Sequence, residues 1–388
     1  MSIFDNASQV LGYSNKASPG VTIIVGSYKI TGWQRVSVRM GIEIMPWTAM
    51  LETSLWQPDM PNGAANTNLK IKEGDECYVI LGSETVLTGY VQTITEEIEP
   101  ENHILRVVIV SKSVDLVECS ALFSTYQMNQ TTVLGIAEQV CKESGVFVWS
   151  AGNAGNTKIQ QFSVILTETA YEVIERATRL AGCLFYDQPN GTILLSPLGT
   201  EHVGTLTVGK SIERLTIMRS QVGRFSKIQA IIQNMAVLFS PPEDGDRQAQ
   251  QMQAQTAPVQ ASATDSGVKR SRTLLIPVEN GDADYAVARQ RVQWEVARRY
   301  GRSQVVEVTC GTWLNCHNKL LQPNTLVTVS NPKSGWKRDY LIAEIEFTQG
   351  EQGTRANLIL MPPEAFKPEP LIVPIAQNEG VAAATRNR

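Results

Sequence analysis

The sequence predicts a mainly β protein with an α+β insert and two similar β-barrel domains. Long stretches alternate apolar and polar residues with a period of two, as strands with one buried face do. The period changes to that of amphipathic helices in residues 131–182 and again near residue 282. A hairpin pattern near residue 79 returns about 250 residues later. That return predicts two barrels rather than one.

The composition is that of a folded multidomain protein. The chain has 388 residues, more than one hydrophobic core usually serves, and it is 43% hydrophobic and 19% charged. A net charge of −4 argues against a dedicated nucleic-acid-binding protein, which is normally basic in at least one domain. No apolar run is long enough to span a membrane, and the N-terminus lacks a secretory signal. We therefore expect a protein made in the cytoplasm without a membrane anchor.

The first predicted barrel covers residues 20–115, after an N-terminal extension at residues 1–19. Residues 35–44, "RVSVRMGIEI", alternate without a break and predict a long strand. Residues 74–94 read as two strands around the turn Gly82-Ser83, and residues 103–110 read as another. The residues before position 35 supply two more strands.

Residues 116–202 are expected to form a small α+β domain. "TTVLGIAEQVCKESG" places apolar residues on one helical face, with Thr131 or Thr132 as the cap and Gly145 at the end. "TETAYEVIERATRLAG" predicts a second helix that stops at Gly182. Asn190-Gly191 between apolar strands predicts a tight hairpin.

The second predicted barrel combines residues 203–239 with residues 303–361, whose last strands are expected at 304–310, 325–330, 338–348 and 355–361. Residues 240–302 interrupt it. Their first part, 240–271, holds no aromatic residue and is rich in Gln, Ala, Pro and Ser, so it predicts a mobile insertion. An arginine-rich helix follows from about Asp282 to Tyr300, and the proline-rich residues 362–388 predict an extended tail.

The internal repeat aligns Val79 with Val329 and Tyr90 with Tyr340, both 250 positions apart. Each unit reads turn, strand, turn, long strand, turn, strand. Two equivalent barrels in one chain are therefore expected to share one strand order.

One motif suggests chemistry. Gly204–Ser211, "GTLTVGKS", satisfies the phosphate-binding loop pattern, which requires a buried strand before it and a helix after it. The intervening residues are β-branched and alternating, and the residues that follow read as extended. We therefore predict a strand between two turn glycines rather than a nucleotide site.

Other signs of chemistry are weak. The histidines His103, His202 and His317 form no helical pair. Cys310, Cys316 and His317 lie close in sequence but lack a fourth metal ligand with suitable spacing. We expect no catalytic residue, no metal and no cofactor. A pair of catalytic carboxylates stays open, because their separation depends on the fold.

The chain resembles the tail hub (late control D) family, the baseplate hub proteins of contractile phage tails such as that of phage Mu. The resemblance covers roughly residues 21–366. It rests on the order and spacing of "IKEGDECYVILGSETVLTGYVQTI", "SKSVDLVECSA", "ETAYEVIERATRLAGCLFYDQPNGTILLSPLG" and "ARQRVQWEVARRYGRSQVVEVTCGTW", the last leading into "LLQPNTLVTV" and "LILMPPEAF". None of these segments is catalytic, and the insertion at 240–271 has no clear counterpart.

The resemblance implies a non-enzymatic late virion protein, assembled in the host cytoplasm into the tail baseplate. Two tail-tube-like barrels per chain would form a homotrimeric ring. The ring would join the sixfold tail tube protein to the threefold central spike protein, contact neighbouring baseplate proteins and leave an axial channel for genomic DNA without binding it specifically.

The resemblance suggests that subunit or partner interfaces include six residues: Tyr90, Tyr340, Arg289, Arg291, Arg298 and Arg299. The arginines also fit a simpler interpretation as the solvated face of a helix. Two other functions stay open. One is a β-rich tail protein that binds a receptor or glycan. The other is an enzyme, either a nucleotide hydrolase using Gly204–Ser211 or a cell-wall glycosidase.

Overall fold

A computed structural model describes residues 20–54, 71–100, 102–122, 126–232, 259–278, 285–351 and 353–367. The predicted N-terminal extension, the tail beyond Lys367 and residues 240–258 of the predicted insertion lie outside the described residues. Among the described helices, each is too short or too polar to span a bilayer. The protein is mainly β with few helices, as predicted.

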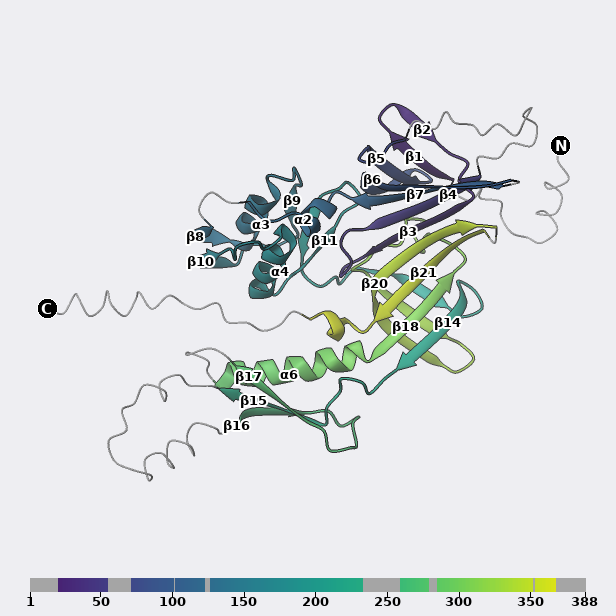
Figure 1. Ribbon diagram of the computed structural model, residues 1–388. Helices are drawn as coiled ribbons and strands as arrows, with labels where there is room; N and C mark the ends of the chain where they lie inside the picture. The colour runs from purple at the N-terminus through teal and green to yellow at the C-terminus, as the bar shows by residue number, and fades with distance from the viewer. Residues whose placement is uncertain are drawn as a thin grey trace, which may run out of the picture.

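Within the described residues, thirteen strands form one large, mostly antiparallel sheet (Figure 1). Its N-terminal half follows the order β3-β4-β7-β6-β5-β1-β2. The period-two stretches identified in the sequence form most of these strands, and β4 is an addition that the sequence analysis did not identify. The strands are β1 (Val21–Val25), β2 (Tyr28–Ile30), β3 (Arg35–Gly41), β4 (Thr48–Ser54), β5 (Glu76–Leu81), β6 (Glu84–Glu99) and β7 (Asn102–Ser111).

The C-terminal half follows the order β14-β18-β21-β20-β19-β13. Its strands are β13 (His202–Thr207), β14 (Ile212–Arg219), β18 (Gln304–Cys310), β19 (Leu326–Asn331), β20 (Trp336–Gly350) and β21 (Gly353–Met361). Pairing of β20 with β3 joins the halves, and one hydrophobic core contains residues from both. The described strands therefore form one continuous sheet that joins the two halves. Barrel closure stays a prediction.

The two halves have the same strand order, as the internal repeat predicts. The pairings of the two halves match when β1, β3, β4, β5, β6 and β7 are taken as the equivalents of β13, β14, β18, β19, β20 and β21. The β1–β2 pair alone has no counterpart among the described strands. The pairing direction differs in one place, because β1 runs antiparallel to β5 whereas β13 runs parallel to β19.

The register refines the repeat. Val91 pairs with Ile109, and Ile342 pairs with Leu360, each 251 positions further on. Both long strands then carry a bulge at the same place, after Val91 and after Ile342. Val79 and Val329 are equivalent at 250 positions, as predicted, but Tyr90 corresponds to Leu341 and not to Tyr340. The second hairpin turn is longer, and this shifts the offset by one residue.

The α+β insert has its own hydrophobic core beside the sheet (Figure 1). The expected caps are present: the Thr132 side chain accepts from Gly135 N–H, and Gly182 ends the second helix in the left-handed conformation. Asn190-Gly191 forms the expected turn. The elements are α2 (Val114–Glu118), β8 (Gln127–Thr132), α3 (Val133–Cys141), β9 (Val148–Ser150), β10 (Lys158–Ser163), α4 (Ala170–Ala181), β11 (Leu184–Asp187) and β12 (Ile193–Ser196).

A third unit contradicts two sequence-based boundaries. β15 (Lys227–Ile232) was expected in the second barrel, and β16 (Val259–Thr264) falls inside the expected mobile insertion. Instead, both pair in a small sheet with β17 (Thr273–Val278), and α6 (Tyr285–Arg302) packs on it (Figure 1). Ala261 and Ala263 of β16 lie in one hydrophobic cluster with Ala288 and Val292 of α6, so small side chains suffice on this face of the strand. A turn of 3-10 helix, η3 (Pro363–Phe366), then lies against α6.

Candidate assembly interface

The two long strands β6 and β20 differ in what lies along their outer edges. β20 pairs with β21 on one side. On the other side it pairs with β19 up to Leu341 and then with β3 along Glu344–Gln349. β6 pairs with β7 on one side, and with β5 only up to Tyr90 on the other. Among the described strands, none covers the outer edge of residues 93–99, which correspond to 344–350.

The second uncovered edge belongs to β14, the equivalent of β3. β14 pairs with β18 and, within the described part of the chain, with no strand on its other side. The Ser220 N–H donates to the Ser303 carbonyl, 2.9 Å away, so Ser220 directs its backbone groups toward the β18 side. Alternation along an antiparallel strand then directs the backbone groups of Leu215, Ile217 and Arg219 outward.

The β3–β20 contact shows how such edges pair in this protein. Ile42 N–H donates to the Ala343 carbonyl at 3.0 Å. On the polar face of the sheet, Ser37 Oγ donates to Glu346 at 2.7 Å. On the core face, Val38 lies opposite Phe347, and both side chains are buried. The contact therefore combines backbone pairing, a polar ladder and hydrophobic burial.

Side-chain exposure distinguishes the uncovered edges from the covered one. Ile217 is 40% exposed, whereas Val38, its equivalent on β3, is 0% exposed. Met218 beside it and Ile98 on β6 are 49% and 71% exposed. Large apolar side chains on an unpaired strand edge are typical of a surface that a partner covers.

The two tyrosines predicted at interfaces have different surroundings. Tyr90 is half-buried in β6, opposite Glu76 and Val110. Tyr340 is buried in the core, and its ring contacts that of Trp336. Their participation in an interface stays a prediction.

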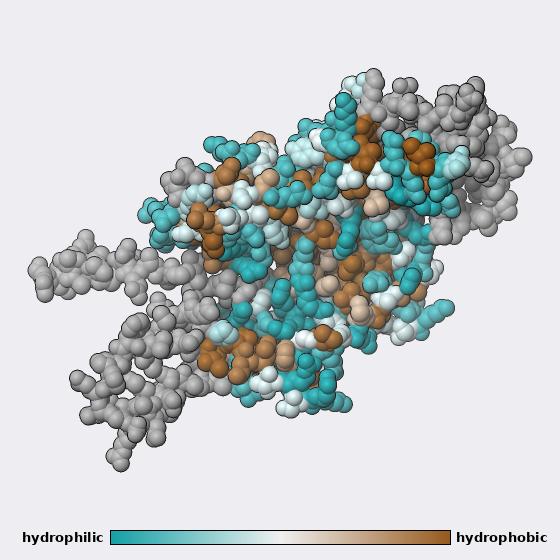
Figure 2. All heavy atoms as spheres, in the orientation of Figure 1, coloured by the Kyte–Doolittle hydropathy of each residue, from teal (hydrophilic) through white to brown (hydrophobic). Residues whose placement is uncertain are grey.

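The four predicted arginines lie on α6 but do not act as one basic face. Arg299 binds Glu295 at 2.6 Å and the Gly223 carbonyl at 2.8 Å. Arg291 and Arg298 both lie over the Trp294 ring, and Arg289 is exposed. Figure 2 shows apolar side chains gathered over the region of β17 and α6, between polar ones. The interface role of these arginines also stays a prediction.

The phosphate-loop pattern at Gly204–Ser211 lies in a strand and a turn, as predicted. Residues 204–207 belong to β13, and β14 rather than a helix follows. The Ser211 hydroxyl accepts from Thr207 N–H at 2.8 Å, so it closes the turn. The backbone here offers no helix N-terminus for phosphates.

One cluster has the residue types of a hydrolytic triad. His202 Nε2 lies 2.7 Å from Thr328 Oγ1, which donates to Asp339 at 2.5 Å. The threonine proton is therefore directed to the carboxylate and not to the imidazole, so His202 cannot act as the base of a nucleophile here. The cluster ties the parallel pair β13–β19 to β20.

The thiols are placed as structural residues. Burial raises the pKa of Cys77, Cys141 and Cys310 to about 12, which keeps these thiols protonated. Cys316 is exposed and donates to the Val203 carbonyl. Within the described residues, no group of three or more His, Cys, Asp or Glu side chains could hold a metal ion.

A buried carboxyl group joins the insert to the sheet. Asp187, at the end of β11, is 1% exposed. Its Oδ2 accepts from Ser111 Oγ at 2.6 Å, Ser113 Oγ at 2.8 Å and Trp47 N–H at 2.9 Å. Burial outweighs these hydrogen bonds and raises the pKa of Asp187 to about 6. Sequence reasoning missed this residue because its partners are more than 70 positions away.

Three family models match consecutive parts of the chain. They are the N-terminal domain of Mu phage baseplate assembly protein GpP-like proteins at residues 20–108, the second domain of baseplate hub protein gp44-like proteins at 113–197, and the fourth domain of GpP at 284–369. Baseplate hub protein gp44 of Escherichia phage Mu is 25% identical over 350 residues, which are 89% of this chain and 88% of gp44.

Two solved structures are similar over nearly the whole chain. The 43 kDa tail protein of prophage MuSo2 from Shewanella oneidensis is 26% identical, with a TM-score of 0.77, over 92% of this chain and 100% of that one. A tail protein from Neisseria meningitidis MC58 is 17% identical, with a TM-score of 0.71, over 90% of this chain and 98% of that one. The second likeness shows the fold alone.

Proposed function

Because the chain belongs to the Mu phage gp44-like baseplate hub family, with GpP-like domains, we propose that three copies close into a ring at the centre of the tail baseplate. The ring joins the sixfold tail tube to the threefold central spike. The observation that carries the proposal is the pair of uncovered strand edges, on β6 and β14, which are the equivalents of two strands that pair within the chain.

The β3–β20 contact supplies the register of the contact between copies. Replacing β3 by β14 and β20 by β6 places Ile217 of one copy opposite Glu96 of the next. Leu215 then lies opposite Ile98, and Arg219 lies opposite Ile94. The outward backbone groups of β14 are those that this register requires.

The side chains on the two edges are complementary in this register. Arg214 lies opposite Glu99, and Arg219 lies diagonally from Glu96, so each cation meets a carboxylate. The exposed side chains of Ile98 and Ile217 become covered. Burial of Ile217 alone contributes about 1–2 kcal/mol to each contact.

The two equivalent halves of each chain support a ring of three copies. A contact between β14 of one copy and β6 of the next joins different surfaces, so repetition gives either a closed ring or an open filament. Each copy contributes two similar units, and three copies therefore present six similar positions around one axis. Six positions match a sixfold tube, while the chain itself repeats only three times and matches a threefold spike.

The function is mechanical rather than catalytic. The ring adapts one symmetry to the other, holds the spike and neighbouring baseplate proteins, and leaves an axial channel through which the genomic DNA passes. The relation to gp44 and the strand geometry at Gly204–Ser211 support this role over nucleotide hydrolysis.

Substitution of Ile217 by proline tests the proposal. The Ile217 N–H points away from β18, so Ile217→Pro removes an outward donor and leaves the β14–β18 bonds in place. We expect the wild-type chain to sediment as a trimer, Ile217→Pro as a folded monomer, and the control Ile217→Val as a trimer.

A charge exchange gives an independent check. Arg214→Glu is expected to weaken the trimer, and Glu99→Arg in the same chain to restore it. A wild-type chain that stays monomeric, or a trimer that Ile217→Pro leaves unchanged, would contradict the proposal.

A further inference from the structure

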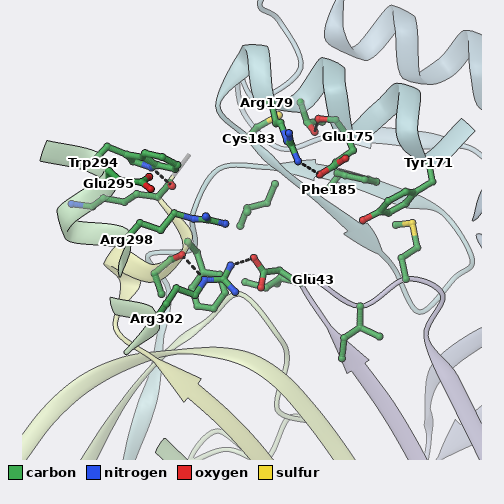
Figure 3. A pocket seen from close by; sticks show the side chains of 18 of the residues that line it. Glu43, Tyr171, Glu175, Arg179, Cys183, Phe185, Trp294, Glu295, Arg298 and Arg302 are labelled. Atoms are coloured by element: carbon green, nitrogen blue, oxygen red, sulfur yellow. Dashed lines mark hydrogen bonds and ion pairs between the residues drawn. The ribbon is translucent and has the colours of Figure 1, made fainter. Parts of the chain in front are cut away.

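A cavity of about 490 Å³ lies where three parts of the chain meet (Figure 3). α6, η3 and Lys367 form one wall, α4 and β11 form another, and the connection between β3 and β4 closes the cavity. Within the described residues, its lining includes no residue of the candidate assembly edges on β6 and β14.

The carboxylates that line the cavity are already paired. Glu43 binds Arg302, Glu175 binds Arg179 at 2.5 Å, and Glu295 binds Arg299 at 2.6 Å. The Arg298 guanidinium, which also lines the cavity, has no such partner among the described residues. In the part of the chain that the structure describes, no carboxylate lies within ion-pair distance of Arg298, whose guanidinium rests 5.3 Å from the centre of the Trp294 ring.

Arg298 is positioned to receive an anion. Figure 3 shows its side chain reaching from α6 into the middle of the cavity, toward the wall that carries Arg179 and Glu175. Burial, followed by the neighbouring Arg302, lowers the pKa of Arg298, because a partly desolvated cation lacks sufficient compensating charge. A carboxylate at this point would supply that compensation.

The cavity also has apolar walls beside the Arg298 charge, which favour an occupant with apolar side chains. Ile44, Leu184, Phe185 and Phe366 contribute apolar walls. The occupant that fits is therefore a peptide segment with an acidic residue next to aliphatic ones, rather than a small inorganic anion.

The chain itself delivers such a segment to the cavity. Lys367 lines the cavity, and its carbonyl accepts from Trp294 Nε1 at 2.7 Å. The next residues are "PEPLIVPI", with Glu369 two positions on. Two residues of extended chain span about 7 Å. Glu369 is therefore within reach of Arg298, which lies over the same Trp294 ring.

We propose that the cavity is a carboxylate site for residues 368–375 of the same chain, in which Glu369 pairs with Arg298 and the aliphatic residues after it cover the apolar walls. Pro368 and Pro370 restrict the segment and reduce the entropy lost on docking. The docked segment would clamp α4 of the insert to α6.

A double-mutant cycle on the full chain tests the pairing. We expect Arg298→Gln and Glu369→Gln each to increase the unfolding equilibrium constant about three- to fivefold, the range of partly exposed ion pairs. The double variant is expected to match either single variant. Two control cycles should be additive. One combines Glu369→Gln with Arg289→Gln on the exposed side of α6, and the other combines Arg298→Gln with Glu379→Gln further along the tail.

Two results would overturn the proposal. Additive effects of Arg298→Gln and Glu369→Gln would show that the two side chains do not interact. Coupling that disappears when the protein is diluted to monomers, as followed by sedimentation, would assign the segment to a neighbouring copy instead of the same chain.

Discussion

The Asp187 junction predicts an unusual dependence of stability on pH. The folded-state pKa of Asp187, about 6, lies above the value of 3.8 for an unperturbed aspartate. Between pH 4 and pH 6, the folded state therefore holds a proton that the unfolded chain has released. The stabilisation is complete below pH 4 and is lost as the pH rises through 6. A shift of this size corresponds to a change of the order of 3 kcal/mol.

Two substitutions separate the charge of Asp187 from its hydrogen bonds. Asp187→Asn keeps an acceptor for Ser111, Ser113 and Trp47 N–H and removes the charge, so it should be at least as stable as the wild type at pH 7.5. Asp187→Ala removes the acceptor that the three donors share, although Trp47 N–H can still donate to Ser111 Oγ, 2.9 Å away. The two serine hydroxyls lie 2.9 Å apart, so one can donate to the other, but the second is left without an acceptor. We therefore expect the free energy of unfolding to fall by about 3–5 kcal/mol.

Urea unfolding of the three proteins at pH values from 4 to 8, followed by circular dichroism, provides the measurement. The free energy of unfolding of the wild type, minus that of Asp187→Asn, should fall with rising pH between 4 and 6 and stay level above 7. A difference that rises across this range, or that does not change with pH, would refute the assignment of a raised pKa to a buried, proton-holding Asp187.

Three further substitutions or digestions test local parts of the fold. Gly89→Ala would place its Cβ 1.8 Å from a carbonyl oxygen of β7, so thermal unfolding should show stability lowered by about 3 kcal/mol or more. The control Gly350→Ala, whose Cβ would have no atom within 4 Å, should change stability by less than about 0.5 kcal/mol. Lys210→Ala should leave assembly intact, and calorimetry should detect no ATP binding in either protein; binding that the substitution abolishes would contradict the strand assignment. Limited proteolysis should cut first within residues 240–258 and leave 259–264 uncut, and early cleavage in β16 would count against its pairing with β15.

Local features of the fold could be predicted from the sequence because a few neighbouring residues determine them. The period-two stretch at 35–44 contains β3, and the apolar stripe after Thr132 forms α3 with that threonine as its cap. The strand at 204–207 could be separated from a nucleotide-binding loop by its β-branched residues alone. The repeat, with Val79 equivalent to Val329, is also a property of the sequence.

Other features were decided by tertiary structure. β16 has a weak local signal, and it becomes a strand because β15 and α6 cover it. The joining of the two halves through β3 and β20 could not be predicted, since period-two alternation identifies a strand but not which distant strand pairs with it. The candidate interface depends on that pairing. Among the described strands, β14 and residues 93–99 of β6 lack the partner that their equivalents β3 and β20 find in each other, and only the folded chain shows this.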